Sequence, residues 1–405
     1  MTRPIRICFM CTHSFTLATL YKGLFPYLTD HGYEIEAIVG DNEYQNFDPK
    51  HFGEFKLNVV PMRRMPHPLK DLVALVRLFR LFRAGKFDVI HVSTPKAALL
   101  GSIAGRLSGA PVVFVYRRCV YEMMTGFKRW FYLQNDRITS AFSNIVVPIS
   151  QQIRSFLRQE RIVGENKLRL IGSGSSNGID IKRFRPDKIA LEETAKLRAS
   201  LNIAEGVPIL LFLGRVCSEK GVNLLPRVLE RVHERHPQAV LIVAGPDDAR
   251  DPASDEALAA FSNHSNIRRI GFVADPSPLY ALCDLFLFPS FFEGFGNVLL
   301  EAAAHERPAI GFDVPGVQEA IAHQESGILV AKNDVDAMAD AATVLLSDAA
   351  SRRAMGIAAR ARVEREFANE VIWTELDRIF RGLSAHPATA SQAIAQTKLI
   401  AASEG

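Results

Sequence analysis

Short runs of apolar residues, many of them β-branched or aromatic, recur along the chain, and amphipathic stretches separate them. In the first half these runs predict six strands, over residues 5–10, 33–39, 56–60, 88–91, 112–115 and 145–148. In the second half they predict five more, over residues 208–213, 239–244, 267–270, 285–289 and 309–311. Runs that are apolar at nearly every position are typical of parallel strands covered on both faces.

The stretches between the strands have the apolar spacing of helices. The clearest predicted helices span residues 69–83, 97–108, 222–236, 299–305, 337–346 and 370–383. Alternating strands and helices predict parallel sheets built from βαβ units. Two such sets predict an α/β protein of two doubly wound, Rossmann-like domains facing a cleft, with ligands at the carboxyl ends of the strands.

The domain boundary is predicted around residues 177–188, where the glycine- and serine-rich stretch 172–178 gives way to a stretch that ends at Pro186. We therefore assign residues 1–180 to an N-terminal domain and residues 181–369 to a C-terminal domain. Residues 370–383 are predicted to form a helix that crosses back to the N-terminal domain. The remaining residues, 384–405, are rich in Ala, Ser and Thr and are predicted to form a flexible tail.

Composition narrows the class of protein. Of the 405 residues, 48% are hydrophobic and 23% are charged, as in ordinary folded domains. No apolar run reaches the roughly 18 residues that a membrane-spanning helix needs, and the N-terminus lacks a signal-peptide pattern, so we expect a cytoplasmic protein. The five cysteines are scattered, which predicts reduced thiols. Cys8 and Cys11 lack the second Cys/His pair that a zinc site would need.

Charge differs between the two halves. Residues 1–180 carry 24 Lys and Arg against 14 Asp and Glu, a net charge of +10, and the remainder carries 24 against 30, a net charge of −6. A basic half fits a phosphorylated substrate or an anionic membrane surface. No nucleic-acid-binding module is recognisable, and we predict no nucleic-acid partner.

Two segments of the basic half, residues 69–83 and 121–132, combine Lys and Arg with many apolar side chains. The interpretation we favour for the first is a helix that covers the sheet. The alternative is that these segments contact an anionic membrane surface, which would suit a lipid-linked acceptor.

Charged residues that could bind a ligand follow two predicted strands of the C-terminal domain. The strand at 208–213 is followed by Gly214, Arg215 and Lys220, and two cations beside a helix start can hold a diphosphate. The alternative is an ordinary charged surface loop.

The strand at 285–289 is followed by Glu293, two glycines and a predicted helix start at about Asn297. Backbone amides at a helix start favour a phosphate. Glu301, one turn into that helix, can accept hydrogen bonds from a ribose diol, and Glu293 can accept them from sugar hydroxyls. The alternative is that both carboxylates are simply solvated.

Taken together, Arg215 and Lys220 after one strand and Glu293 and Glu301 after another resemble the retaining glycosyltransferases of family four, which have a GT-B fold. The resemblance covers nearly the whole chain. Residues 91–101 resemble the family's segment after the fourth strand. Residues 172–180 resemble a subgroup that builds bacterial surface polysaccharides and lipid-linked oligosaccharides.

The resemblance implies roles for the matching residues. The catalytic residues would be Glu293, Arg215, Lys220 and Arg117. The donor would contact Gly214, Arg215, Lys220, Phe272, Val273, Glu293, Gly294, Phe295, Gly296, Asn297, Val298 and Glu301, with the nucleobase at Phe272 and Val273 and a phosphate at the amides of residues 296–298. The acceptor side would include His13, His91, Ser93, Lys96 and Asn177.

The resemblance also implies partners. The donor would be a nucleotide sugar, with UDP favoured over GDP, and the acceptor a glycan or a lipid-linked, phosphorylated molecule. Neither a metal nor another cofactor is expected, and transfer would retain the anomeric configuration. The enzyme would work in the cytoplasm, at the inner face of the cell membrane where it contacts that surface.

The chain departs from the family pattern in two places. Residues 11–15 read Cys-Thr-His-Ser-Phe where the family often has a glycine-rich loop. Arg117 stands where many members carry a histidine. Arginine cannot act as a base near neutral pH, but it can stabilise anionic charge.

Other functions stay open on the sequence alone. Ser176 lies in a Gly-x-Ser-x-Gly pattern that is typical of hydrolase nucleophiles, although no helix is expected directly after it. Asp334 and Asp336 fit the Asp-x-Asp pattern of metal-dependent transferases, but they begin a predicted helix, where Asp is favoured as a cap. A non-catalytic protein that binds nucleotide sugars is the third alternative.

Overall fold

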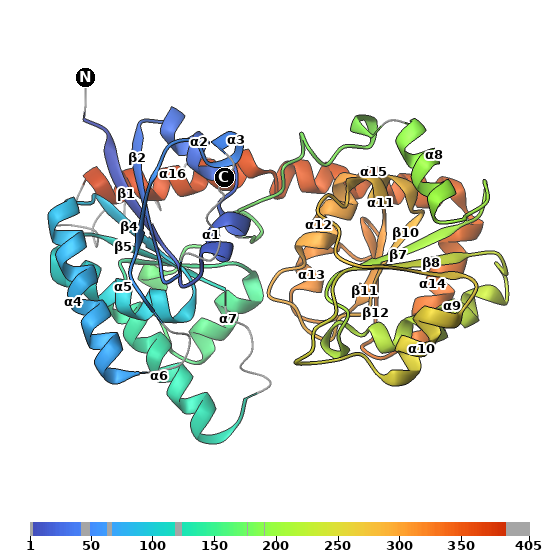
Figure 1. Ribbon diagram of the computed structural model, residues 1–405, viewed down its shortest axis with the longest axis horizontal. Helices are drawn as coiled ribbons and strands as arrows, with labels where there is room; N and C mark the ends of the chain where they lie inside the picture. The colour runs from blue at the N-terminus through green and yellow to red at the C-terminus, as the bar shows by residue number, and fades with distance from the viewer. Residues whose placement is uncertain are drawn as a thin grey trace. The chain divides into compact units, whose positions relative to one another are not determined.

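The computed structural model describes residues 3–41, 49–62, 67–117, 124–175, 177–189 and 191–385. The chain divides into two compact units, one formed by residues 1–178 and 369–405 and the other by residues 179–368. Each unit contains a parallel sheet with helices on both faces (Figure 1). The prediction of two doubly wound, Rossmann-like units is therefore confirmed.

Among the described residues, the N-terminal unit has a six-stranded parallel sheet in the order β3-β2-β1-β4-β5-β6. Its strands are β1 (Ile5–Met10), β2 (Tyr33–Val39), β3 (Lys56–Val59), β4 (Val89–Val92), β5 (Val112–Tyr116) and β6 (Ile145–Pro148). All residues of β4 and β5 are buried, because helices cover both faces. The strand order reverses between β1 and β4, the position at which ligands bind in folds of this kind.

The helices described in this unit are α1 (Ser14–Leu20), α2 (Leu24–Asp30), α3 (Pro49–Phe52), α4 (Pro68–Gly85), α5 (Pro95–Ser108), α6 (Gly126–Phe142), α7 (Gln151–Gln159) and α16 (Asn369–Ala385). Helix α16, from the far end of the sequence, packs against α2 and β4. Phe380 is fully buried, with its ring centroid 6.3 Å from that of Phe9. The Tyr33 hydroxyl donates a hydrogen bond of 2.7 Å to Asp377. The last helix is thus part of the core of the N-terminal unit.

Among the described residues, the C-terminal unit has a second six-stranded parallel sheet in the order β12-β11-β10-β7-β8-β9. Its strands are β7 (Ile209–Leu213), β8 (Val240–Ala244), β9 (Ile267–Ile270), β10 (Leu285–Phe288), β11 (Ala309–Phe312) and β12 (Gly327–Val330). Here the order reverses between β7 and β10. These are the two strands that the predicted donor motifs follow.

The α-helices described in this unit are α8 (Leu191–Ser200), α9 (Leu225–His233), α10 (Asp255–Asn263), α11 (Ser277–Leu282), α12 (Asn297–Ala304), α13 (Val317–Ala320), α14 (Val335–Ser347) and α15 (Ala349–Glu366). The helix predicted over residues 222–236 is in fact two pieces. A 3-10 turn at Val222–Leu224 leads into α9, which has a proline in its first turn. Proline is accepted there because it lacks only an amide that the helix start leaves unbonded.

Candidate functional site

Two loops meet at the carboxyl edge of the C-terminal sheet, where the strand order reverses. The β7 loop (residues 214–221) follows β7 and the β10 loop (residues 289–296) follows β10. The Phe291 amide in the β10 loop donates to the Glu219 carbonyl in the β7 loop at 3.0 Å. The structure therefore brings together the two motifs that the sequence singled out, although about 70 residues of chain separate them.

Gly221 allows this close approach of the two loops. Its φ is +69°, and a Cβ at this position would lie 1.9 Å from the carbonyl oxygen of Pro289. No side chain fits in that space, and only glycine adopts such a φ without strain. The position of the β7 loop against the β10 loop therefore depends on this glycine.

Lys220 and Glu293 form an ion pair between the two loops. Their side chains are only 12% and 15% exposed. Burial raises the pKa of Glu293, and the neighbouring Lys220 ammonium opposes that shift. A mostly buried pair of this kind presents an ammonium suited to phosphate oxygens beside a carboxylate suited to sugar hydroxyls.

Arg215 is held by an acidic partner that the sequence did not reveal. Its guanidinium contacts the Asp248 carboxylate and lies 3.6 Å from Glu219. Asp248 also accepts two hydrogen bonds of 3.0 Å from Arg250. The hydrogen bonds from Arg250 and Arg215 hold the pKa of Asp248 well below its usual range. The position of Asp248, shortly after a buried strand, is the signal that could have identified it.

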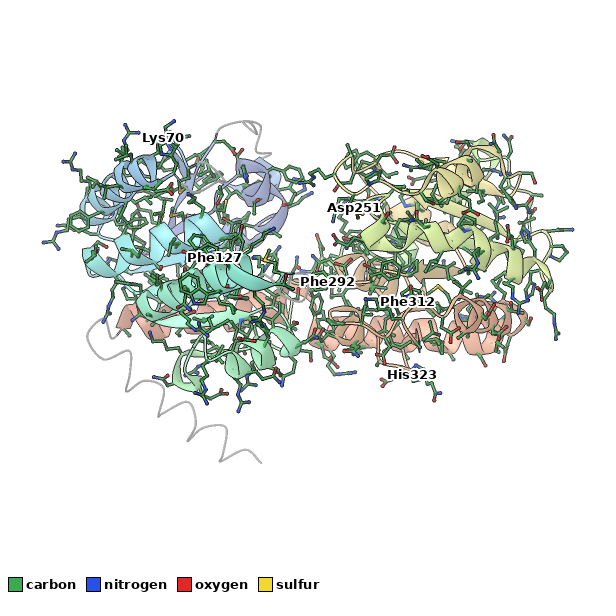
Figure 2. All side chains as sticks on the ribbon, turned by 90° about the horizontal axis from the view of Figure 1, so that it is seen from below. Lys70, Phe127, Asp251, Phe292, Phe312 and His323 are labelled. Carbon is green, nitrogen blue, oxygen red and sulfur yellow. The ribbon has the colours of Figure 1, made fainter. Side chains whose placement is uncertain are left out.

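Asp251 also holds the β7 loop, through hydrogen bonds from two of its backbone amides. Its carboxylate accepts a hydrogen bond of 2.7 Å from the Glu219 amide, and its carbonyl accepts one of 3.2 Å from the Ser218 amide. Asp251 is labelled in Figure 2. Gly214, at the start of the loop, lies so close to Gly245 that a Cβ on Gly245 would be 1.9 Å from the Gly214 carbonyl oxygen.

The start of α12 differs in one respect from the expectation. The helix begins at Asn297, as predicted, but two of the three amides expected to be free are bonded. The Gly296 amide donates to the Gly316 carbonyl at 3.4 Å, and the Asn297 amide donates to the Phe295 carbonyl at 2.9 Å. The Gly296 amide is bonded because the backbone at Gly316, with a φ of +77°, packs directly against this loop, whereas the Asn297 amide bonds within its own turn. Of these three amides, only that of Val298 has no acceptor among the described residues.

Glu301 lies half-buried on α12, and the Tyr280 hydroxyl donates to it at 2.9 Å. Burial raises the pKa of Glu301 to about 7, although the hydrogen bond from Tyr280 acts in the opposite direction. Tyr280 was not predicted, because a tyrosine on an apolar helix resembles any other core residue. The carboxyl of Glu301 can therefore change its charge near neutral pH.

The remaining predicted donor residues differ in exposure. The Phe272 side chain, after β9, is 77% exposed, and the neighbouring Val273 is half-buried. Gly294 is half-buried within the β10 loop. Phe295 is buried and packs on Phe367 with 5.6 Å between ring centroids, so its side chain belongs to the core of the unit.

In the N-terminal unit, three predicted residues gather at the carboxyl edge of the sheet. His91 on β4 is buried between the rings of Phe9 and Tyr21, and burial lowers its pKa to about 3. Ser93 accepts a hydrogen bond of 2.7 Å from the Tyr21 hydroxyl. The guanidinium carbon of Arg117 lies 5.9 Å from the centre of the Tyr21 ring. Tyr21 joins these residues and was not predicted.

The other acceptor-side residues have structural contacts. His13 Nδ1 lies 2.5 Å from the Asp41 carboxylate. Lys96 forms an ion pair of 2.6 Å with Asp71, which joins α5 to α4. The amide oxygen of Asn177 accepts a hydrogen bond of 2.8 Å from the Trp373 indole, so Asn177 ties α16 to its unit.

The structure also bears on the alternative sites. Ser176 lies outside the described residues. Asp334 caps α14 by accepting a hydrogen bond from the Ala337 amide at 2.9 Å, and Asp336 pairs with Arg231 at 3.0 Å. Within the described ranges, no three His, Cys, Asp or Glu side chains are grouped so that they could hold a metal ion. Burial raises the pKa of the Cys11 thiol to about 12.

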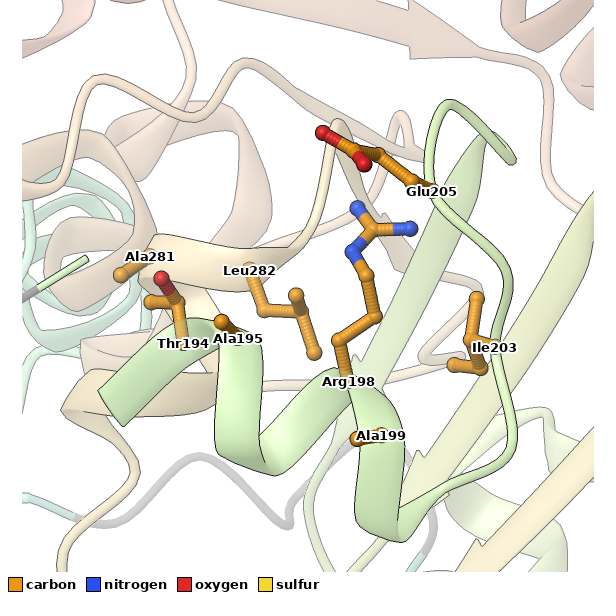
Figure 3. A pocket seen from close by; sticks show the side chains of 8 residues that line it. All are labelled: Thr194, Ala195, Arg198, Ala199, Ile203, Glu205, Ala281 and Leu282. Atoms are coloured by element: carbon orange, nitrogen blue, oxygen red, sulfur yellow. The ribbon is translucent and has the colours of Figure 1, made fainter. Parts of the chain in front are cut away.

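One cavity of the C-terminal unit, of about 420 Å³, lies at α8 and α11 (Figure 3). Its lining residues are Thr194, Ala195, Arg198, Ala199, Ile203, Glu205, Ala281 and Leu282. None of them is a predicted site residue. Arg198 donates to the backbone carbonyls of Ala204 and Val207, so its guanidinium closes a turn.

Comparisons with known proteins agree with the division of the chain into two units. Residues 21–174 match the family model described as a glycosyl transferase 4-like domain, and residues 207–348 match the model described as glycosyl transferases group 1. No helix that the structure describes is both long enough and apolar enough to span a bilayer.

Relatives of known name resemble most of the chain. The capsular polysaccharide biosynthesis glycosyltransferase CapM of Staphylococcus aureus is 28% identical over 362 residues, covering 89% of this chain and 93% of that protein. The UDP-Gal:alpha-D-GlcNAc-diphosphoundecaprenol alpha-1,3-galactosyltransferase of Escherichia coli is 21% identical over 288 residues, covering 69% and 72%. The solved structure of Anabaena HepE in complex with UDP has a TM-score of 0.76 and 19% identity, covering 93% of this chain and 100% of that one.

Proposed function

Because the chain belongs to the family-four type of glycosyltransferases and has their GT-B fold, we propose that it transfers a sugar from a UDP-sugar to a glycan or lipid-linked acceptor. The proposed setting is the synthesis of a bacterial surface polysaccharide, at the cytoplasmic face of the membrane. One observation carries the proposal for the site. The Lys220–Glu293 ion pair joins the two loops that hold the family's donor motifs, at the point where the strand order of the C-terminal sheet reverses.

In this proposal each donor residue acts on the part of the nucleotide sugar that its chemistry suits. Arg215 and Lys220 hold the diphosphate, because cations pair with phosphate oxygens. Glu301 accepts hydrogen bonds from the ribose, and Glu293 accepts them from the sugar. Phe272 and Val273 contact the nucleobase, and the Val298 amide donates to a phosphate.

The proposed chemistry is displacement of UDP at the anomeric carbon, with retention of configuration. Negative charge develops on the leaving phosphate in the transition state. Cations that are already in place stabilise that charge without having to reorganise. Asp248 and Glu293 keep Arg215 and Lys220 in place before the donor arrives. These carboxylates therefore support catalysis by positioning the two cations.

The choice of UDP rests on the relatives. HepE was solved with UDP, and the Escherichia coli relative is named for a UDP-sugar donor and a diphosphate-linked lipid acceptor. Retention and the absence of a metal requirement follow from the family resemblance. We expect full activity in excess chelator. Loss of activity in chelator would instead support Asp334 and Asp336 as metal ligands.

Calorimetric titration with UDP, GDP and ADP in chelator tests the donor site. We expect UDP to bind most tightly, and the double variant Arg215→Ala/Lys220→Ala to lose that binding. The double variant Arg235→Ala/Arg353→Ala, which removes two cations from other parts of the same unit, is the matched control. Equal binding of all three nucleotides, or unchanged binding after loss of Arg215 and Lys220, would refute this donor site.

We further propose that α4 and α6 contact an anionic membrane. One face of α4 is buried, but its other face exposes Leu69, Leu72, Val73 and Val76. On α6, Phe127 is 75% exposed and stacks on Trp130 with 5.5 Å between ring centroids. Both helices pack on α5, and exposed cations accompany these apolar groups, among them Lys70, Arg77, Arg80 and Lys128. Figure 2 labels Lys70 on α4 and Phe127 on α6.

Flotation with phosphatidylglycerol vesicles at low salt tests this contact. We expect binding to phosphatidylglycerol but not to phosphatidylcholine, and loss of binding in Phe127→Ser/Trp130→Ser. Ile357→Ser, which removes an exposed apolar side chain from α15, is the matched control. Failure of the native chain to bind, or binding that survives the double substitution, would refute the contact.

A further inference from the structure

A cluster of polar groups surrounds one cation at the carboxyl edge of the N-terminal sheet. We define the Arg117 cluster as Arg117, Tyr21, His91, Ser93 and Cys11. Arg117 follows β5, Ser93 follows β4 and Cys11 follows β1, so three neighbouring strands contribute. The Tyr21 hydroxyl donates to Ser93 at 2.7 Å, and the Arg117 guanidinium carbon lies 5.9 Å from the Tyr21 ring centre.

The guanidinium of Arg117 is incompletely bonded. Its Nε and Nη2 atoms are buried and have no hydrogen-bond partner among the described parts of the chain. Buried donors in folded proteins nearly always have a partner, so each exception calls for an explanation. These two N–H groups lie on the same edge of the guanidinium plane, the edge that forms paired hydrogen bonds with two oxygens of one anion.

The other members of the cluster supply no negative charge. Burial, helped by the nearby Arg117 charge, lowers the pKa of His91 to about 3, so its imidazole is neutral. Burial raises the pKa values of the Cys11 thiol and the Tyr21 phenol. The nearby carboxylate of Asp41 is occupied by His13 and Ser14. Among the residues that the structure describes, the cluster is therefore a positive charge without a counter-ion of its own.

We propose that the Arg117 cluster binds a phosphoryl group of the acceptor, through the Nε–Nη2 edge of Arg117. The assignment to the acceptor rests on the proposed function, in which the C-terminal unit holds the donor. The hydroxyl of Ser93, which is fully buried, accepts from Tyr21 and so holds the phenol beside the Arg117 guanidinium. The acceptor class this implies is a phosphate- or diphosphate-linked sugar or lipid.

The test uses the full chain with the donor site disabled by Arg215→Ala/Lys220→Ala, and inorganic pyrophosphate as the probe. Titration calorimetry should detect pyrophosphate binding in this parent. Arg117→Met should weaken it by at least tenfold, because hydrogen bonds to a charged group are lost. Arg106→Met, which removes an exposed cation from the last turn of α5, should leave binding within threefold.

Thermal unfolding separates ligand binding from a structural role. Because the buried Nε and Nη2 have no partner, Arg117→Met should leave the unfolding temperature unchanged or raise it. A lower unfolding temperature with pyrophosphate binding intact would mean that Arg117 supports the fold, and it would overturn the proposal. Absence of pyrophosphate binding in the parent would overturn it as well.

Titration of the otherwise native chain with UDP separates this proposal from the proposed function. We expect Arg117→Met to leave UDP affinity unchanged. A tenfold loss would show that the anion belongs to the donor and would overturn the assignment to the acceptor. If the native chain fails to bind UDP, the proposed function fails, whereas the pyrophosphate result still decides whether the Arg117 cluster binds an anion.

Discussion

Arg215 is held in place by Asp248 before any ligand arrives, and this makes its substitution informative. Arg215→Ala should lower turnover by about 10²–10³, the cost typical of losing one donor that stabilises charge in a transition state. Steady-state kinetics with saturating donor measure this. The effect should appear mainly in kcat, because the charge on the leaving phosphate grows as the bond breaks.

Arg250→Ala is the matched control for Arg215. Arg250 contacts the same Asp248 carboxylate, but its side chain is mostly exposed and lies outside the proposed donor contacts. Turnover of this variant should stay within about threefold of the native enzyme, as is usual for surface substitutions. Equal losses in the two variants would show that Asp248, rather than Arg215, is the group that matters.

Glu301 makes donor binding depend on pH. Its carboxyl has a pKa of about 7, raised from the ordinary value by burial, so it is ionised above that pH and protonated below it. A ribose diol donates more strongly to the ionised form. UDP affinity should therefore fall as the pH drops through 7, by at most about tenfold per pH unit, and level off at the weaker affinity of the protonated form.

Glu301→Gln provides the baseline for this pH effect. Glutamine keeps an acceptor oxygen but does not titrate, so the part of the pH dependence due to Glu301 should disappear. The terminal phosphate of UDP itself titrates near pH 6, and the variant retains that contribution. Parallel profiles for the two proteins between pH 5.5 and 8 would rule out a role for the Glu301 charge.

Individual residues of the site differ in how far the sequence could predict them. Arg215, Lys220 and Glu293 stand directly after apolar strands, so their position at the sheet edge was evident. Asp248 and Tyr280 act through contacts that only the folded chain creates. The bonded state of the Gly296 amide depends on Gly316, about twenty residues further along the chain.

At the scale of secondary-structure elements, substitutions of two glycines test how much the contact between the β7 and β10 loops contributes to stability and to UDP binding. Gly221 and Gly206 both have positive φ values, +69° and +76°, but only Gly221 lies against another backbone. Gly206→Ala should cost about 1–2 kcal/mol, from the backbone conformation alone. Gly221→Ala should cost clearly more and should also weaken UDP binding, because the loops must move apart.

Denaturant unfolding together with UDP titration measures both effects. The difference between the two variants isolates the steric contact, since the backbone cost is common to them. Equal losses of stability, with UDP affinity unchanged in both, would mean that the two loops can separate without affecting the site.

The positions of most strands could also be predicted from the sequence. Eleven strands lie within one residue of their predicted ends, because short continuous apolar runs are typical of parallel strands that are covered on both faces. The missed strand, β12, is only Gly327–Val330 at the sheet edge, and half of its residues are not fully buried. A run this short is too weak a pattern to distinguish from a loop.

For the molecule as a whole, the last helix completes the first unit. Helix α16 buries Ile372, Trp373, Leu376, Phe380 and Leu383 against the N-terminal unit. Fully burying one such side chain contributes roughly 1.5–3 kcal/mol. Their sum is comparable to the total stability of a typical domain, about 5–15 kcal/mol. Ending the chain at Ala368 should therefore prevent the N-terminal unit from folding.

Hydrogen exchange and calorimetry can follow the two units separately. In the chain that ends at Ala368, the β1–β6 sheet should lose its protection while the C-terminal unit still unfolds cooperatively and binds UDP. A chain that ends at Ala385 keeps α16 and should behave like the native protein. A protected N-terminal sheet without α16 would show that the helix is dispensable for folding.

Because residues 179–368 separate the two parts of the first unit in the sequence, α16 is synthesised well after the rest of that unit. After Gly178 leaves the ribosome, the whole of residues 179–368 must be made before α16 appears. At roughly 5–20 residues per second, this interval is about 10–40 s. During that time the newly synthesised N-terminal unit exposes the apolar surface that α16 later covers. Chaperones bind exposed apolar surfaces of this kind. The second unit is thus the first that can finish folding.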